Sequence, residues 1–306
     1  MKVNLGYCCV SMLHKKLQCN RSSTKTYLEK HSKEFCHDYL IDKSIANIKD
    51  LMALLWRNHE LEIMAFRIPE QILPQVDLGY YQIEEVSRQL REAGKVANQL
   101  NIQLSTHPSQ YFVLNSLRVD VVERTIHSLS MIADTFACME LEKIPNLTLH
   151  LGVKNGYDTE LAAINQFCAN YKRLGEAARN YLVLENDHVS FTVDQCLKVH
   201  EQIGIPIVFD NKHYEWNPGC LSYDDAIRLA TATWSGAYIE GKGRIPKLHL
   251  SSDRDQKKHA HSDYVQVDDY MKMVTSLEKT KIVECNIMLE CKKKDEAVLK
   301  LRRELE

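Results

Sequence analysis

The chain has 306 residues, of which 44% are hydrophobic, and its formal net charge is −2 at pH 7. This length fits one large domain or two small ones and allows a sizeable buried core. The balanced charge excludes binding to nucleic acid through a globally basic surface, so a nucleic-acid partner would need a local groove.

The ten cysteines include no Cys-x-x-Cys pair, so we expect free thiols in a reducing compartment. The first residues, MKVNLGYCCVSML, lack the apolar stretch of a signal peptide. No segment approaches the roughly 20 apolar residues of a membrane span. We therefore expect a cytoplasmic protein without membrane association. We also expect it to be a monomer.

Strand and helix patterns alternate along the whole sequence. The first expected strand, Val3–Cys9, is followed by a polar stretch at 11–37, expected to be a long loop. The other expected strands are 61–68, 102–106, 146–151, 181–185, 206–210, 246–250 and 285–290. The expected helices are 38–58, 80–100, 119–140, 159–179, 192–203, 222–233, 267–279 and 293–304.

Eight strand–helix units predict a (β/α)₈ TIM barrel that occupies residues 1–306 as one domain. The rival fold is a doubly wound open sheet, but no G-x-G-x-x-G follows the first strand. No linker rich in Pro, Gly or Ser divides the chain.

Charged and imidazole side chains gather where six of these strands end. Barrel enzymes place their active sites at these carboxyl ends. The residues are His107, His150, Glu185, Asp210, His213, Lys247, His249, His261 and Glu290. Each one alone could be a backbone-bonded histidine or a helix cap. Together, however, they would be unfavourable in an empty buried cavity, and divalent metals prefer such ligands.

The number of candidate ligands predicts a cluster of two or three ions. A mixture of histidines and carboxylates without cysteine suits Mn, Zn, Co or Fe(II), and the sequence does not choose among them. Metals a few ångströms apart activate water and stabilise the leaving oxygen in displacement at phosphorus. The spacing indicates no Ser–His or Cys–His pair, so water is the expected nucleophile.

At this point the motifs resemble those of the UV damage endonucleases, the UvdE family of DNA-repair enzymes. The matching segments, in order, are Leu5-Gly-Tyr7, Asn20-Arg21, Phe66-Arg-Ile68, His107-Pro-x-Gln110-Tyr111, Leu149-His-Leu-Gly152, Leu184-Glu-Asn-Asp187, Asp210-x-x-His213, Asn217-Pro-Gly219, Lys247-x-His249 and Met288-x-Glu-x-Lys292. The resemblance implies a barrel similar to endonuclease IV, with up to three metal ions, usually manganese (zinc, cobalt and magnesium stay open). It also implies cleavage of double-stranded DNA immediately 5′ to a UV photoproduct, with abasic sites as a further candidate substrate.

The resemblance also implies roles for individual residues. The metal ligands would be His107, His150, Glu185, Asp210, His213, His249, His261 and Glu290. Lys247 matches a lysine that the family carboxylates, and Gln110 and Tyr111 match a pair that probes the duplex beside a flipped-out lesion. Glu185, Lys247, His249 and Tyr7 would be the catalytic set, although a core tyrosine is an equal interpretation of Tyr7. Asn20 and Arg21 are candidate DNA contacts.

Two positions depart from the family pattern. Leu78 stands where the family has a histidine four residues after Pro74, and Asp77 is the candidate substitute. Tyr214 replaces the second histidine that often occurs in the sixth-strand motif. We expect weaker occupancy of one metal site rather than loss of function.

Three alternatives stay open. The first is a metal-dependent sugar isomerase or epimerase of the xylose-isomerase type, which shares the barrel and the metals but needs no duplex-probing loop. The second is an abasic-site endonuclease of the endonuclease IV type. The third is a DNA-binding protein with a degenerate metal site.

Overall fold

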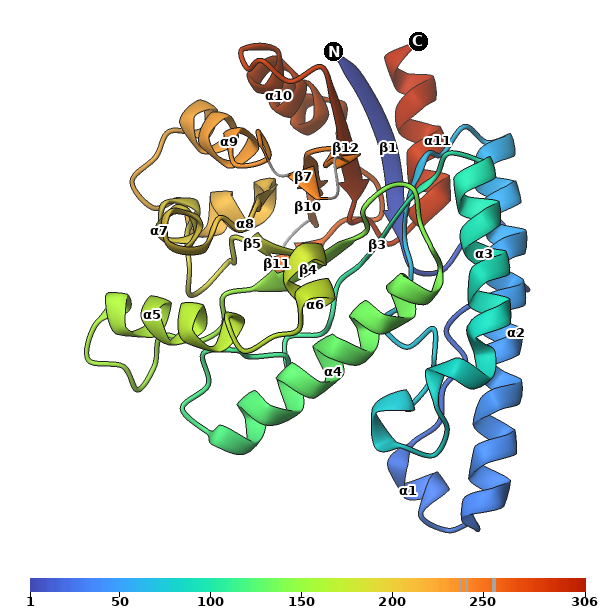
Figure 1. Cartoon of the computed structure of the whole chain (residues 1–306). Coiled ribbons are helices and arrows are strands. Elements are labelled where there is room, and N and C mark those ends of the chain that lie inside the picture. Colours follow the sequence, from blue (N-terminus) through green and yellow to red (C-terminus); the bar gives the residue numbers. More distant parts are fainter. Residues whose placement is uncertain (237, 240–241, 255–256) are drawn as a thin grey trace.

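Eight parallel strands close into a barrel in the computed structural model, which describes residues 1–236, 238–239, 242–254 and 257–306 (Figure 1). The strand order around the barrel is β1-β12-β9-β6-β5-β4-β3-β2. The barrel strands are β1 (Lys2–Cys8), β2 (Ala65–Arg67), β3 (Gln103–Thr106), β4 (Asn146–His150), β5 (Leu182–Glu185), β6 (Ile207–Asp210), β9 (Lys247–Leu250) and β12 (Glu284–Leu289). The predicted TIM barrel is confirmed.

The helices cover the outside of the barrel (Figure 1), and two short hairpins come directly before and after β9 in the sequence. The helices are α1 (Lys25–Leu28), α2 (Lys33–Glu60), α3 (Ser87–Gln99), α4 (Val119–Cys138), α5 (Glu160–Tyr171), α6 (Glu176–Tyr181), α7 (Val193–Ile203), α8 (Asn211–Trp216), α9 (Tyr223–Ala232), α10 (Val267–Glu278) and α11 (Lys294–Leu305), with 3₁₀ turns η1 (Val76–Leu78) and η2 (Ile83–Val86). The hairpins are β7 (Tyr238–Ile239) with β8 (Lys242–Gly243), and β10 (Asp253–Arg254) with β11 (Lys257–His261).

The polar stretch at 11–37 is not one long loop. It contains α1, and α2 begins at Lys33, because the Ser32 side chain caps the helix by accepting a hydrogen bond from the Phe35 amide. The same helix runs to Glu60, and the expected strand at 61–68 is shorter than predicted, at Ala65–Arg67. The apolar residues Leu61, Ile63 and Met64, which suggested a longer strand, lie in the connection between the end of α2 and β2.

Two other expected helices are interrupted. The segment 159–179 is divided into α5 and α6, and Gly175 occupies the N-cap of the second helix in an extended conformation. The segment 80–100 begins with the 3₁₀ turn η2 before α3. In addition, α8 follows β6 directly and was not predicted. Asp210 starts it by accepting a hydrogen bond from the His213 amide at 2.7 Å.

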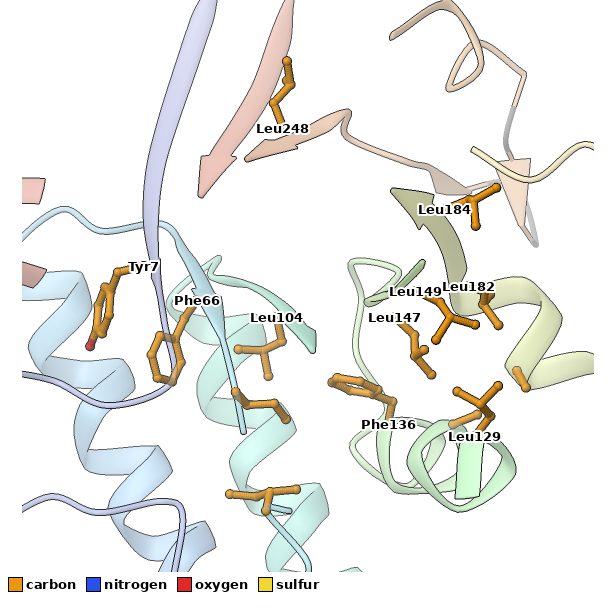
Figure 2. Packing of buried hydrophobic residues seen from close by; sticks show 14 of the residues in the cluster. Tyr7, Phe66, Leu104, Leu129, Phe136, Leu147, Leu149, Leu182, Leu184 and Leu248 are labelled. Carbon is orange, nitrogen blue, oxygen red and sulfur yellow. The ribbon is translucent and has the colours of Figure 1, made fainter. Parts of the chain in front are cut away.

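The strands alternate apolar side chains toward the helices with polar side chains toward the barrel axis. On β4, Leu147 and Leu149 pack in the hydrophobic core with Leu129 and Phe136 of α4 (Figure 2). Thr148, between those leucines, accepts a hydrogen bond from the Lys247 ammonium of β9 at 3.1 Å, which crosses the barrel interior. Residues of the same parity therefore share the interior.

The register places the ends of neighbouring strands level with each other. His150 of β4 pairs with Glu185 of β5, and Asp210 of β6 pairs with His249 of β9. Parallel strands in a closed barrel present these positions at one end, the carboxyl end. In the part of the chain that the structure describes, no helix has the length and apolarity that crossing a membrane requires.

Candidate metal centre

Glu185, at the end of β5, is the centre of a compact group of imidazoles. One carboxylate oxygen lies 2.7 Å from Nε2 of His107, and the other lies 2.8 Å from Nδ1 of His249. Nε2 of His150 and Nδ1 of His213 lie 3.8 and 3.4 Å from the same carboxylate. Glu185 is fully buried. The fold thus brings four histidines from three other strand ends and from α8 around one carboxylate.

Glu290, which follows β12, extends this group toward the connection after β9. Its carboxylate lies 3.3 Å from Nδ1 of His249 and 3.7 Å from Nε2 of His261. Asp210 completes the arrangement, with Oδ1 3.9 Å from Nδ1 of His213. All eight residues predicted as ligands therefore lie in one connected cluster, and their role as ligands stays a prediction.

The donor set fits divalent cations. Two groups each offer ligand atoms within 4.8 Å of one another, namely His107, His150 and Glu185, and Glu185, Asp210 and His249. Within the described part of the chain, buried Oδ2 of Asp210, Nδ1 of His150 and Nε2 of His249 have no hydrogen-bond partner. Buried oxygen and nitrogen lone pairs without a partner are costly. Cations bound by the carboxylates and by neutral imidazoles meet that need.

The pKa values of the cluster show how strongly its members interact. Burial lowers the pKa of His107 to about 4, although the neighbouring Glu185 carboxylate opposes this shift. Burial also disfavours the charged form of His213, but the carboxylates of Asp210, Glu185 and Glu290 outweigh it and raise its pKa to about 9. For Glu185, the surrounding histidines outweigh burial and hold its pKa well below its usual range. The environment of the cluster thus gives two histidines, His107 and His213, very different pKa values.

Lys247 lies deeper in the barrel than the histidines. Its ammonium donates to Oγ of Ser105 at 3.3 Å and to Oγ1 of Thr148 at 3.1 Å. Burial, with a smaller contribution from the cation of Arg67, lowers the pKa of Lys247 to about 8. A substantial fraction of a lysine with this pKa is neutral near pH 8, and only a neutral amine adds CO₂.

Arg67 is a site residue that sequence reasoning did not assign. Its guanidinium forms an ion pair with Oε1 of Glu290, the oxygen that also faces His249. Both side chains are mostly buried. The available signal in the sequence was its position directly after the apolar pair Ala65-Phe66, at the end of β2.

Gln110 and Tyr111 lie at the tip of an anchored loop. Both are exposed, with 73% of Tyr111 accessible, although large aromatic rings usually bury most of their surface. The Ser109 amide donates to Oε2 of Glu70 at 2.6 Å, and the Val113 amide donates to Oγ1 of Thr125 at 3.2 Å. These bonds fix the backbone on both sides of the tip, so the ring is held out to solvent by a restrained loop.

Asn20 and Arg21 lie on the connection between β1 and α2. Asn20 is exposed. The Arg21 guanidinium forms an ion pair with Asp50 at 2.7 Å, and its backbone amide donates to Oδ1 of Asn47. The charge of Arg21 is therefore partly neutralised within the protein, which weakens the case for a phosphate contact at this position.

Tyr7 points away from the cluster. It is fully buried on the outer side of β1, where its ring packs against Phe66 with centroids 4.9 Å apart (Figure 2). Its hydroxyl donates to Oδ1 of Asn58 in α2 at 2.9 Å, and burial raises its pKa. This placement agrees with the core interpretation of Tyr7 and disagrees with direct participation at the barrel mouth.

The two departures also have defined positions. Leu78 is part of η1 and is partly exposed. Asp77 does not join the cluster, because its carboxylate accepts a hydrogen bond from Ser128 of α4 at 3.1 Å. The substitution of Asp77 for the missing histidine stays a prediction. Tyr214 packs against Phe209 and Tyr223, and its hydroxyl donates to the carbonyl of Leu221.

Comparison with known proteins places these features in a family. The family model described as UV-endonuclease UvdE matches residues 3–306. The UV-damage endonuclease of Schizosaccharomyces pombe is 29% identical over 99% of this chain and 50% of its own length. The UV DNA damage endonuclease of Halalkalibacterium halodurans is 25% identical over 100% of this chain and 94% of its own.

Solved structures agree at the level of the whole fold. The crystal structure of SacUVDE superposes with a TM-score of 0.86 at 26% identity, covering 99% of this chain and 98% of that one. D-psicose 3-epimerase from Clostridium cellulolyticum H10 gives a TM-score of 0.53 at 11% identity, over 78% of this chain and 79% of that one, and so shares the barrel alone. The chain spans about half the length of its fission-yeast relative and nearly all of its bacterial one. The chain belongs to the UvdE family of UV endonucleases.

Proposed function

We propose that this protein is a metal-dependent endonuclease that hydrolyses the phosphodiester bond immediately 5′ to UV photoproducts in double-stranded DNA. Family membership supports a nuclease acting on DNA. The observation that carries the metal dependence is the carboxylate of Glu185, which is buried among four imidazoles. The neighbouring Asp210, His150 and His249 each keep a buried atom without a hydrogen-bond partner, which bound cations would satisfy. Divalent cations also stabilise the negative charge that develops in phosphodiester hydrolysis.

The eight clustered residues would hold two or three ions, of which Mn²⁺ is the proposed choice and Zn²⁺, Co²⁺ and Mg²⁺ the alternatives. Bound ions of this kind supply Lewis acidity and an activated water for in-line displacement at phosphorus. In this arrangement Glu185 and His249 are first candidates for catalysis, because Glu185 belongs to both groups of converging donors. Lys247 would contribute an anionic oxygen after carboxylation, in place of a buried cation beside the cluster.

The loop that carries Gln110 and Tyr111 supplies a means of finding the lesion. A damaged base pair unstacks more easily than an intact one, and a planar amide and ring can replace the lost stacking. The hydrogen bonds of this loop to Glu70 and Thr125 support such a role, because a side chain inserted between bases must keep its position while the neighbouring bases tend to restack. Asn20 and Arg21 are secondary candidates for contacts to the DNA backbone.

We further propose that residues 1–306 act as one catalytic unit, as a monomer, in the compartment that holds the DNA. Repair of abasic sites is a second candidate activity of the same centre. A sugar epimerase shares only the barrel with this chain, and it has no use for an exposed, anchored Tyr111.

The test is a nicking assay on supercoiled plasmid. UV-irradiated, depurinated and untreated plasmids are incubated with the protein in Mn²⁺ or in EDTA, and nicked circles are counted. We expect nicking of irradiated DNA in Mn²⁺ and none in EDTA. Equal nicking of irradiated and untreated DNA would contradict lesion recognition, whereas nicking of depurinated DNA alone would favour the abasic-site activity.

A further inference from the structure

Two asparagines at the carboxyl ends of neighbouring strands make the same unusual contact. The side-chain amide of Asn186 donates to the carbonyl of Asp210 at 3.1 Å and accepts from the amide of Asp210 at 2.9 Å. The side chain of Asn211 does the same with Ser251, with both distances at 2.9 Å. All four groups are buried. Each asparagine therefore satisfies both backbone groups of one residue on the next strand.

The two contacts occupy equivalent positions in the barrel. The ladder between β5 and β6 pairs Glu185 with Val208, so Asn186 lies level with Phe209 and reaches one residue further, to Asp210. The ladder between β6 and β9 pairs Asp210 with His249, so Asn211 lies level with Leu250 and reaches one residue further, to Ser251. Each side chain thus acts as an additional rung of the parallel sheet at the point where the backbone ladder stops.

These rungs connect residues of the metal centre to one another. Asn186 directly follows Glu185 and holds Asp210, while its own carbonyl lies 2.9 Å from Nδ1 of His213. Asn211 directly follows Asp210 and holds Ser251, whose hydroxyl lies 2.8 Å from Nδ1 of His261. The contacts therefore run in series from Glu185 through Asp210 to His261.

We propose that Asn186 and Asn211 are positioning residues that keep the metal ligands of β5, β6 and β9 at binding distance before any ion is present. This inference rests on the proposed metal centre. The physical need arises because Glu185 and Glu290 disfavour the negative charge of the buried Asp210, and His213 and His249 oppose this effect. Strand ends that are not hydrogen-bonded would separate under that repulsion, and each ion would then have to reassemble its own site.

The chain offers a matched control. Asn115 makes the same paired contact with the backbone of Val153, at 2.7 and 2.9 Å, but joins two connecting loops rather than two ligand-bearing strand ends. Its loss removes the same number of hydrogen bonds. A purely structural effect would appear equally in all three alanine variants.

The experiment compares Asn186→Ala, Asn211→Ala and Asn115→Ala with the unmodified protein by Mn²⁺ titration calorimetry and by thermal unfolding in EDTA. We expect all three variants to unfold at lower temperature. We expect Mn²⁺ binding to weaken roughly 10- to 100-fold in the first two, as is typical when residues that orient ligands are lost, and to stay within about twofold in Asn115→Ala. Unchanged Mn²⁺ affinity in the first two, or an equal loss in Asn115→Ala, would overturn the proposal.

A second measurement does not depend on a variant that folds or on metal binding. Amide hydrogen exchange of the unmodified protein in EDTA reports whether the rungs exist without ions. We expect the amides of Asp210 and Ser251 to exchange as slowly as those of the strands. Rapid exchange at both amides would refute the rungs. If the unmodified protein binds no Mn²⁺ yet protects these amides, the proposed metal-dependent function fails while the rungs stand as structural contacts only.

Discussion

The carboxylate of Glu185 lies 2.7 Å from Nε2 of His107, although 78 residues separate them in the chain. Glu185 also contacts His249 and belongs to both groups of converging donor atoms. Its replacement should therefore affect more than one ion. We expect Glu185→Gln to reduce nicking by more than about 100-fold, because the loss of a ligand exceeds the loss of an outer contact.

The Glu185→Gln substitution removes a buried negative charge but keeps the size of the side chain. We therefore expect its circular dichroism spectrum to match the unmodified protein, which separates a chemical defect from misfolding. Full nicking activity with reduced Mn²⁺ affinity would show that the carboxylate binds metal without serving the reaction.

Removal of metal should lower both the stability of the fold and the affinity of the protein for DNA. Three divalent ions would add six positive charges at the barrel mouth to a chain of formal net charge −2. Ions present at about 100 times their dissociation constant would stabilise the folded state by about 2.7 kcal/mol. We expect EDTA to lower the melting temperature and to weaken binding to lesion-containing duplex, measured by fluorescence anisotropy. Equal DNA affinity with and without metal would exclude a contribution from these charges.

Lys247 should respond to bicarbonate and to pH. Its pKa of about 8 leaves the ammonium charged at pH 6 and increasingly neutral as the pH rises through 8. Only the neutral amine adds CO₂, forming a carbamate and releasing a proton. We expect a carbamate signal in ¹³C NMR with labelled bicarbonate that is larger at pH 8.5 than at pH 6.5. The Lys247→Arg variant is the control and should lack both the signal and stimulation of nicking by bicarbonate.

Tyr111 should affect lesion discrimination without affecting stability. Its ring is 73% exposed, so Tyr111→Ala removes few contacts within the protein. Stacking on a base contributes about 1–3 kcal/mol, which corresponds to about a 5- to 150-fold loss of affinity for damaged duplex. Val119, equally exposed and a few residues further along the chain, gives the control Val119→Ala. A similar loss in both variants would argue against a specific role for the tyrosine ring.

A variant of Tyr7 tests whether this residue has the catalytic role that the family resemblance implies or the core role that its position in the structure indicates. The Tyr7→Phe variant loses the hydrogen bond to Asn58 and leaves a buried amide oxygen without its donor. We expect a destabilisation of about 1–2 kcal/mol in urea unfolding, with nicking of irradiated plasmid unchanged. A large loss of turnover in a stable Tyr7→Phe protein would restore the catalytic assignment.

Much of the candidate metal centre could be predicted from the sequence because strand periodicity is local. A short apolar strand that ends in His, Asp or Glu is visible in six places, and parallel strands in a barrel bring their carboxyl ends together. His107, Glu185 and Asp210 were therefore identifiable without coordinates. Leu149 and Leu184, in the same apolar runs, pack in the hydrophobic core.

The tertiary structure decided the features that depend on side-chain direction and on distant partners. Tyr7 follows the parity of Leu5 and faces α2, whereas the neighbouring Cys8 lies near Arg67 and Glu290. Arg67 finds Glu290 across 223 residues. Asn186 and Asn211 find backbone partners 24 and 40 residues away. A local sequence pattern cannot encode such pairings, because they arise only when barrel closure sets the register between strands.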